Sequence, residues 1–337
     1  MKTLRIRLPF GRFFLYAFLI ALSFSLALEL LARTSYITAL RLPQAYGTSH
    51  PHFEPQLSRL KERIAQDGQI DCIFIGNSQV LYGIDPEVVE QTYLAETGRP
   101  IHCQNFGLGG LPPMTAGSLA RVLIENFHPS LIVFGTGLWD YSSANAFSTD
   151  QSIASSPWFQ YQLGYPSLDG WLYTRSDAFR YLFGVDRALK TRDNKSDNIN
   201  AYGHATYSDH TGLTVPEQVE YFETIAKRPE LTETQTNGLR DLLTLSTAQT
   251  RILLVETPFD PTFLTVNRKA RLLYPDFKNM LTHQAEQAGV DLWMTQENIL
   301  FTQDEWYDLI HLNDAGAVHF SRLLGEYLAA VLASQPQ

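Results

Sequence analysis

Three residues in this chain could together perform nucleophilic acyl transfer. Ser78 follows a short apolar run, and Asp308 and His311 lie three residues apart near the end of the sequence. A serine hydroxyl attacks an ester only when a base takes its proton, and histidine, which titrates near neutrality, suits that role. A carboxylate on the second imidazole nitrogen holds the tautomer and stabilises the imidazolium. We therefore interpret Ser78 as a candidate nucleophile, His311 as its base and Asp308 as the group that orients the base.

Five short apolar runs are predicted to be the strands that position these residues. The runs are residues 71–76, 101–107, 130–135, 251–258 and 290–295. They are bounded by glycine, proline or polar residues, as buried strands are. Helical patterns separate them, which indicates an α/β fold with a parallel five-stranded sheet and helices on both faces. Sites in such sheets form beyond the carboxyl ends of the strands, where Ser78 and His311 are both expected.

Further groups at the same edge could stabilise a tetrahedral intermediate. Residues 105–110, "NFGLGG", are predicted to form a glycine-rich turn with free N–H groups. Ser78 is expected to open a helix, so its own N–H is not used within the helix and can join an oxyanion hole. A serine, an Asp-x-x-His pair and free N–H donors are together the inventory of acyl transfer.

Three blocks of the sequence resemble blocks I, II and V of the SGNH (GDSL-like) hydrolase superfamily. They are "FIGNSQ" (74–79), "NFGLGG" (105–110) and "DLIHLNDAGA" (308–317). The resemblance implies a flavodoxin-like three-layer sandwich and an enzyme that acts on ester bonds without a cofactor or metal. It implies Ser78 as nucleophile, His311 as base, Asp308 as its orienter and Gly110 as an oxyanion N–H donor.

The chain departs from that family pattern in two places. Asn77 precedes the serine where the family usually has aspartate. Residues 135–140, "GTGLWD", lack the asparagine whose side chain usually donates to the oxyanion. Trp139 and Asp140 fall near that position and are candidate substrate-binding residues. Asn105 or a backbone N–H could supply the missing oxyanion donor.

The N-terminus predicts a membrane anchor. Four basic residues precede an almost unbroken apolar run at 13–32, which is long enough to cross a bilayer as a helix. More basic charge precedes the run than directly follows it, which favours an N-terminus inside and the rest outside. We expect a cytoplasmic tail and anchor over 1–35, a juxtamembrane segment over 36–68 and a catalytic domain over 69–335. A signal peptide cleaved near residues 25–27 is the alternative.

Residues 141–230 interrupt the strand–helix rhythm and are predicted to form a partly helical cap over the strand ends. The aromatic residues of this insertion fit either a sugar-binding site or packing of the cap. They include Trp158, Trp171, Tyr202 and Tyr207. His204, Asp209 and His210 suggest a metal site, but loop histidines without supporting ligands are usually solvated, so we predict no metal.

Charge and cysteine content narrow the function further. The net charge is −9 and no long basic run is present, which argues against nucleic acid as a partner. Cys72 and Cys103 both fall in predicted strands, where neighbouring cysteines make strained disulfides, so we expect them to be unpaired.

Together these features predict ester cleavage or formation through an acyl-Ser78 intermediate. The anchored arrangement resembles cell-surface members of the family that acylate or deacylate envelope polymers. By that resemblance, the substrate is an acyl ester or a carbohydrate of an envelope polysaccharide or glycolipid, and a membrane acyltransferase is a candidate partner. One alternative is an esterase of small esters. Another is a non-catalytic scaffold or glycan-binding subunit of a polysaccharide modification or export system.

Overall fold

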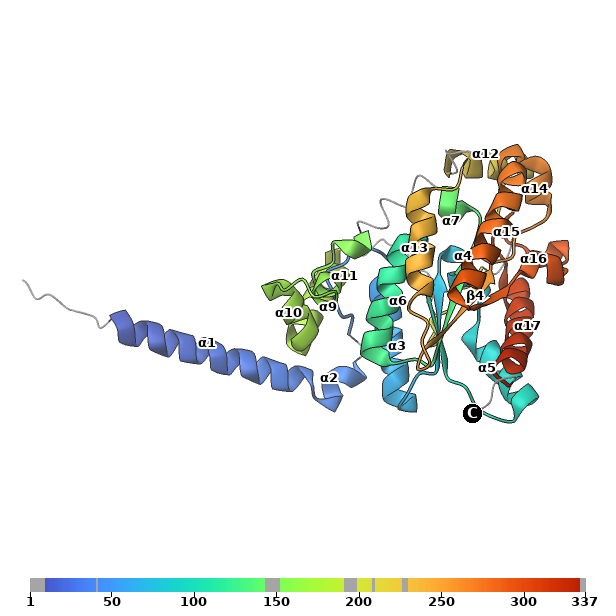
Figure 1. Ribbon diagram of the computed structural model, residues 1–337. Coiled ribbons are helices and arrows are strands. Elements are labelled where there is room, and N and C mark those ends of the chain that lie inside the picture. The colour runs from blue at the N-terminus through green and yellow to red at the C-terminus, as the bar shows by residue number, and fades with distance from the viewer. Residues whose placement is uncertain are drawn as a thin grey trace, which may run out of the picture.

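A parallel sheet organises the molecule. The structure, a computed structural model, describes residues 10–40, 42–142, 152–190, 199–207, 210–225 and 230–333. Five parallel strands form one sheet in the order β2-β1-β3-β4-β5. They are β1 (Cys72–Gly76), β2 (Cys103–Gly107), β3 (Leu131–Thr136), β4 (Arg251–Glu256) and β5 (Asp291–Trp293). This confirms the predicted α/β fold with helices on both sides of a five-stranded parallel sheet (Figure 1).

Each face of the sheet buries its own apolar core. Successive side chains of a strand point to opposite faces, so Ile73 and Ile75 belong to one core and Cys72 and Phe74 to the other. The first face is covered by α3 (Phe53–Asp67), α6 (Pro113–Phe127), α13 (Glu233–Leu243) and α15 (Arg268–Ala288). The second face is covered by α5 (Pro86–Thr97) and α17 (Asp314–Ala333). Burial on both faces explains why the strands appear as continuous apolar runs.

Each of the three strands nearest Ser78 has a glycine at or next to its carboxyl end. Gly107, Gly76 and Gly135 lie side by side in register at the carboxyl ends of β2, β1 and β3. A Cβ on Gly76 would lie 2.4 Å from the carbonyl oxygen of Gly135 and 2.4 Å from a methyl carbon of Val80. Side chains in this row would push α4 (Ser78–Gly83) away from the sheet. The glycines therefore allow α4, and Ser78 with it, to sit directly on the strand ends.

Short helices complete the described chain. Near the strand ends and around the site are α7 (Trp139–Ser142), α14 (Thr262–Val266), α16 (Thr295–Asn298) and the 3₁₀ turn η1 (Gln303–Glu305). The insertion contains α9 (Pro157–Gln162), α10 (Leu168–Arg175), α11 (Asp177–Lys190) and α12 (Val215–Ile225).

The insertion has two parts, and only the second approaches the strand ends. Helices α9–α11 pack beside the N-terminal segment, where Phe53 meets Trp158 and Phe159 and the N–H of Ala45 bonds to Arg180. Figure 1 shows them on the side of α1 (Phe10–Ala32), so this part is not the predicted cap. The described residues from 199 onward run past α4 and the loop before α17 instead: the N–H of Ala205 bonds to the carbonyl of Leu81, and the N–H of Asp314 bonds to the carbonyl of Tyr207.

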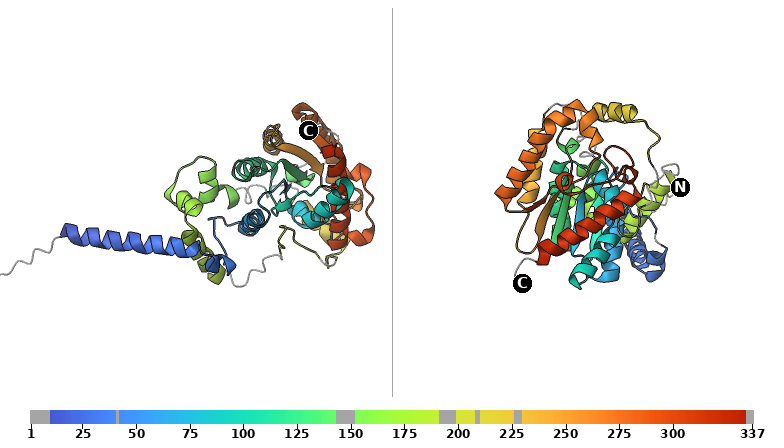
Figure 2. Two further views of the ribbon diagram at one scale, coloured as in Figure 1. Left: turned by 90° about the horizontal axis from the view of Figure 1, so that it is seen from below. Right: turned by 90° about the vertical axis from the view of Figure 1, so that its right-hand side faces the viewer.

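The N-terminal helix α1 lies apart from the sheet domain, with its side chains largely exposed (Figures 1 and 2). Among the described residues it is the one helix long and apolar enough to cross a membrane, over Phe13–Ala32 with a mean hydropathy of 2.1. The short helix α2 (Ser35–Ala39) follows it. Cys72 and Cys103 lie opposite each other on neighbouring strands, and both are buried with free thiols.

Candidate active site

The structure brings together the three residues chosen as a catalytic set. Ser78 Oγ lies 2.8 Å from His311 Nε2, although the two residues are 233 positions apart in the chain. His311 Nδ1 lies 2.8 Å from Asp308 Oδ2. An ionised carboxylate only accepts hydrogen bonds, so Nδ1 carries the proton and Nε2 is left to accept from the serine hydroxyl. This is the tautomer that general-base catalysis requires.

Asp308 shapes the turn that carries His311. Its Oδ1 accepts the backbone N–H groups of Ile310 at 2.8 Å and His311 at 2.7 Å. The two side chains therefore meet through a tight turn before α17. Burial by itself would raise the pKa of Asp308, but the charge of His311 and these hydrogen bonds outweigh it and lower the pKa. The carboxylate thus stays ionised where an imidazole titrates.

The residue before the serine is explained by a buried partner. Asn77 caps α4, because its Oδ1 accepts the N–H of Gln79 at 2.7 Å. Its Nδ2 donates to Asp140 Oδ1 at 2.6 Å, and Asp140 Oδ2 accepts from Thr136 Oγ1 and the Gly137 N–H, both at 2.9 Å. An aspartate at 77 would set two carboxylates against each other. Asn77 and Asp140 therefore fix the turn that presents Ser78.

The structure places neither candidate substrate-binding residue as an open contact group. Asp140 is buried and both of its oxygens are occupied. Trp139 is half-buried and packs edge-on against Phe259 and Phe263. Of Trp139 and Asp140, it is the accessible side of Trp139 that could contact a ligand.

Burial gives Asp140 a distinct pH signature. Burial raises the pKa of Asp140 to about 6, against an ordinary 3.8, although the hydrogen bonds from Gly137, Asn77 and Thr136 act the other way. A raised pKa means that the folded protein takes up the proton first as the pH falls. Proton uptake by Asp140 therefore stabilises the fold. This contribution to the free energy of unfolding is complete below the ordinary pKa of 3.8 and is lost as the pH rises through about 6.

Asp140→Asn is therefore expected to cost more stability at low pH than at neutral pH. At pH 7 it should lower the free energy of unfolding by about 1–3 kcal/mol. The reason is that the new NH₂ group cannot accept a hydrogen bond from the groups that donate to Asp140. Towards pH 4 the native protein should gain up to about 3 kcal/mol that the variant lacks. Urea unfolding of both proteins from pH 4 to 7 measures the gap. A gap that stays constant or narrows towards acid pH would contradict the burial of an ionisable Asp140.

Asn105 does not take the predicted part in the oxyanion hole. It lies inside β2 rather than in the turn after it, and it is fully buried. Its Nδ2 donates to the carbonyl oxygens of Val80 and Ile84, both at 2.7 Å, and its Oδ1 accepts the N–H of Gly107. The Asn105 amide therefore holds α4 against the sheet and is not available to a substrate.

Backbone N–H groups are the donors that remain. The side-chain amide of Gln79 is also occupied, because it donates to the carbonyls of Pro258 and Ile310. Among the described residues, no acceptor pairs with the N–H of Ser78 or Gly110. Gly110 has a φ of 72°, which a glycine adopts without strain. The N–H of Leu108 bonds to the carbonyl of Gly76, so the Gly110 turn is tied to the strand that precedes Ser78.

Two histidines that sequence reasoning missed hold this turn. His50 Nε2 lies 3.0 Å from the carbonyl oxygen of Gly109, and the N–H of Gly109 donates to His52 Nδ1 at 3.2 Å. Burial lowers the pKa of His50 to about 4, so it is neutral at physiological pH. Both polar groups of Gly109, the neighbour of Gly110, are thus fixed by the segment that follows the N-terminal helix. We call His50 and His52 the histidine clamp.

His52→Ala is expected to lower kcat about tenfold with little change in KM. The variant leaves the Gly109 N–H without its acceptor, and a net hydrogen bond of about 1–1.5 kcal/mol corresponds to that factor. His52→Asn, whose Oδ1 can still accept, should restore most of the rate. Steady-state kinetics with an aryl ester measures both, with exposed His283→Ala as control. Equal rates for His52→Ala and the wild type would show that the clamp does not position the turn.

A stack of three tyrosines flanks His311. Tyr207 from the insertion stacks on Tyr82 at 3.8 Å and on Tyr307 at 3.9 Å between ring centroids. The Tyr207 ring lies 5.8 Å from the His311 ring in an edge-on arrangement. Sequence reasoning included Tyr207 among four candidate aromatics. The other three lie elsewhere: Trp158 in the core, Trp171 on the surface, and Tyr202 under Arg63.

The candidate metal residues do not gather. His204 is buried and lies 3.1 Å from the carbonyl oxygen of Tyr82, while His210 is exposed. Asp209 lies outside the described residues. Within the described part of the chain, no group of three or more histidine, cysteine or acidic side chains could hold an ion.

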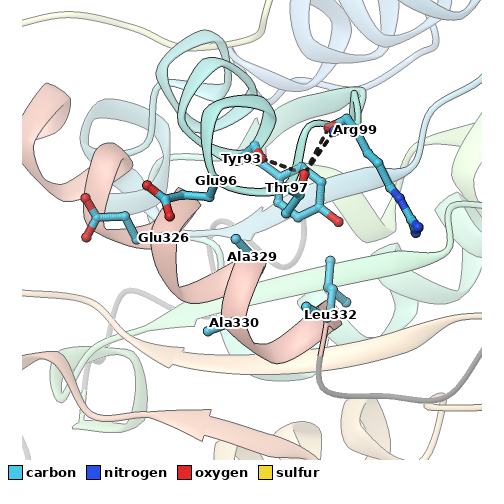
Figure 3. A pocket seen from close by; sticks show the side chains of 9 residues that line it. Tyr93, Glu96, Thr97, Arg99, Glu326, Ala329, Ala330 and Leu332 are labelled. Carbon is cyan, nitrogen blue, oxygen red and sulfur yellow. Dashed lines mark hydrogen bonds between the residues drawn. The ribbon is translucent and has the colours of Figure 1, made fainter.

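A separate surface pocket lies far from Ser78. Figure 3 shows it between the C-terminal halves of α5 and α17, with a volume of about 660 Å³. Its lining includes Glu96, Arg99 and Glu326 but no serine, histidine or cysteine. In Figure 1, this part of α5 and the end of α17 lie at the opposite end of the sheet from α7. The pocket therefore has neither the groups nor the position for acyl transfer.

No family model and no curated protein sequence matches the chain. Among solved structures, Est24, a carbohydrate acetylesterase from Sinorhizobium meliloti, matches with a TM-score of 0.39 and 12% identity over 78% of this chain and 100% of its own. The lipase/acylhydrolase from Enterococcus faecalis gives 0.39 and 11%, over 78% and 97%. The aryl esterase of M. smegmatis gives 0.36 and 10%, over 77% and 99%. All three are esterases or acylhydrolases, but at these values no residue role is transferred from them.

Proposed function

We propose that this chain is a serine esterase or O-acyltransferase of the SGNH (GDSL-like) type that works through an acyl-Ser78 intermediate. The observation that carries the proposal is the continuous hydrogen-bonded series from Ser78 Oγ through His311 to Asp308, with 2.8 Å at both steps. Ser78 is partly exposed at the end of the sheet, so an ester can reach its hydroxyl. A purely structural serine would not need a histidine oriented by a partly buried carboxylate.

The proposed reaction has two steps. His311 Nε2 takes the proton of Ser78 as Oγ bonds to the ester carbonyl carbon, and the N–H groups of Ser78 and Gly110 stabilise the oxyanion. The imidazolium then gives its proton to the departing alcohol, which leaves an acyl-Ser78 ester. In the second step, His311 takes a proton from water or an acceptor hydroxyl, which attacks the acyl group. The proton returns to Ser78 as the product ester or acid leaves.

A carbohydrate is the acceptor or substrate that we favour, in an envelope polysaccharide or a glycolipid. The support is Tyr307, the half-buried outer ring of the tyrosine stack beside His311, because sugar rings pack well on aromatic side chains that also carry a polar group. We further propose that α1 is an uncleaved single-pass anchor with its N-terminus in the cytoplasm and the sheet domain outside. Its length and composition support this. A membrane acyltransferase that supplies the acyl group would fit this location.

Transfer and hydrolysis should be distinguishable with one substrate. We expect slow turnover of a small aryl ester, because within the described part of the chain we assign only backbone donors to the oxyanion, and one lost donor typically costs about 10²–10³ in rate. An oligosaccharide acceptor should raise the release of the aryl alcohol several-fold and yield an acylated sugar, if deacylation limits the rate. The two products are separated and quantified by mass spectrometry. Fast hydrolysis that no acceptor changes would instead favour a simple esterase.

A further inference from the structure

Three exposed apolar side chains gather at the beginning of α10. The exposed fractions are 63% for Tyr165, 72% for Leu168 and 48% for Trp171. Leu168 and Trp171 lie one helical turn apart and so share a face. The other four of the five tryptophans in the chain are buried or half-buried. We call Tyr165, Leu168 and Trp171 the α10 patch.

The α10 patch belongs to the part of the insertion that lies beside α1. Figure 1 and the left-hand view of Figure 2 both show α9 and α10 reaching back along α1, level with its last turns. These last turns are the outer end of the apolar span Phe13–Ala32. A helix at this level lies where the hydrocarbon of a bilayer gives way to headgroups.

Hydrogen bonds fix α11, and with it the rest of this part, to α1. Glu29 in the last turns of α1 accepts from Ser176 Oγ at 2.7 Å and from the N–H groups of Asp177 at 3.0 Å and Ala178 at 3.2 Å. Arg33 also donates to Glu29 at 2.8 Å. A carboxylate from α1 therefore caps the N-terminus of α11, which satisfies helix N–H groups and matches the helix dipole.

We propose that the α10 patch inserts into the headgroup region of the outer leaflet of the bilayer that α1 crosses. The inference rests on the proposed membrane anchoring of α1. Tyrosine and tryptophan concentrate at this depth in membrane proteins, because their rings are apolar and their N–H or O–H groups are polar. The attachment through Glu29 holds the α10 patch at that depth whenever α1 spans the bilayer. A bilayer is thus the occupant that the position and the chemistry of the α10 patch both fit.

This contact would orient the active site as well as the anchor. Helix α11 also holds the segment that leads to the histidine clamp: the N–H of Ala45 bonds to Arg180 at 3.0 Å, and Arg187 pairs with Glu54 at 2.8 Å. The same segment carries His50 and His52, which fix Gly109. A continuous set of contacts therefore leads from the membrane helix to the candidate oxyanion turn.

Trp171 makes the proposal measurable in the full-length protein. The protein is reconstituted into phosphatidylcholine vesicles, and flotation first establishes whether it stays with the lipid. Tryptophan emission is then compared between ordinary lipid and lipid brominated near the headgroup end of the acyl chains. We expect the brominated lipid to remove about one fifth of the emission, because one of five tryptophans meets it. This loss should vanish in Trp171→Phe, which keeps the surface apolar, and should fall in Leu168→Asp but not in Leu300→Asp, a change of another exposed leucine.

The outcomes separate the two proposals. Flotation with Trp171-dependent quenching supports the contact. Flotation without it, together with equal iodide quenching of Trp171 in vesicles and in detergent, would overturn the contact and leave the anchor intact. A protein that does not float would contradict the anchor and the contact together, while the assignment of Ser78 and His311 would be untouched.

Discussion

Ser78→Ala and His311→Ala are each expected to lower kcat/KM for an aryl ester on the order of 10⁴-fold or more, and the double variant should be no slower than either. The hydroxyl at 78 and the imidazole 2.8 Å away act in the same proton transfer, so removal of one leaves nothing for the other to do. Residual turnover would come from substrate binding and the backbone N–H groups alone. Steady-state kinetics on the single and double variants measures this non-additivity.

Matched controls separate loss of chemistry from loss of fold. Ser130 and His283 are exposed residues away from the triad, and their replacement by alanine should leave kcat/KM unchanged. Ser78 and His311 are only partly buried, so their alanine variants should keep the wild-type circular dichroism spectrum and nearly the same Tm. Losses that multiply in the double variant would mean that the two residues do not act as one unit.

Asp308→Asn should be the second most damaging change, with a fall in kcat of about 10³–10⁴. The two backbone N–H groups that Oδ1 accepts would hold the amide oxygen at that position. The amide NH₂ then faces His311 Nδ1, which must become an acceptor. The proton moves to Nε2. Nε2 then carries a hydrogen that faces the serine hydroxyl, and it can no longer accept the serine proton. The base is present but in the wrong tautomer.

The pH dependence distinguishes this account from a general loss of structure. Because the pKa of Asp308 lies below its ordinary value, protonation of this carboxylate should not set the acid limb of the wild-type rate profile. A lowered pKa stabilises the fold above the ordinary pKa of 3.8, and this is lost as the pH falls through the folded value. Asp308→Asn lacks this pH-dependent stabilisation, so the free energies of unfolding of the two proteins should converge as the pH falls. A variant with near wild-type kcat at pH 7 would remove Asp308 from the mechanism.

The sheet and the proximity of Ser78 to His311 could both be predicted from the sequence. Each strand is a short apolar run, and parallel topology sends the residues after the strands to one edge, whatever their separation in the chain. The structural role of Asn105 could not be predicted in this way. The predicted strand at 101–107 already contained Asn105, but no local pattern shows that its side chain bonds to the carbonyls of Val80 and Ile84 in another element.

The histidine clamp and the partner of Asn77 were missed for a different reason. His50 and His52 lie in a segment without helical or strand periodicity, and their contact with Gly109 joins positions 57 and 59 residues apart. Asn77 departs from the family pattern because its side-chain amide donates to Asp140, a contact with a different loop. Both features depend on tertiary contacts between loops, which no local pattern in the sequence encodes.

The central claim is that Ser78 is an activated nucleophile, and a fluorophosphonate probe tests it most directly. The probe phosphonylates a serine only when a base removes the hydroxyl proton during attack. Intact folded protein is treated with the probe, digested, and examined by mass spectrometry to locate the adduct. We predict one adduct, on Ser78, that is absent in Ser78→Ala and forms much more slowly in His311→Ala. A folded wild-type protein that never labels would contradict the enzyme and favour a non-catalytic scaffold. An adduct on another serine that persists in Ser78→Ala would contradict the choice of nucleophile.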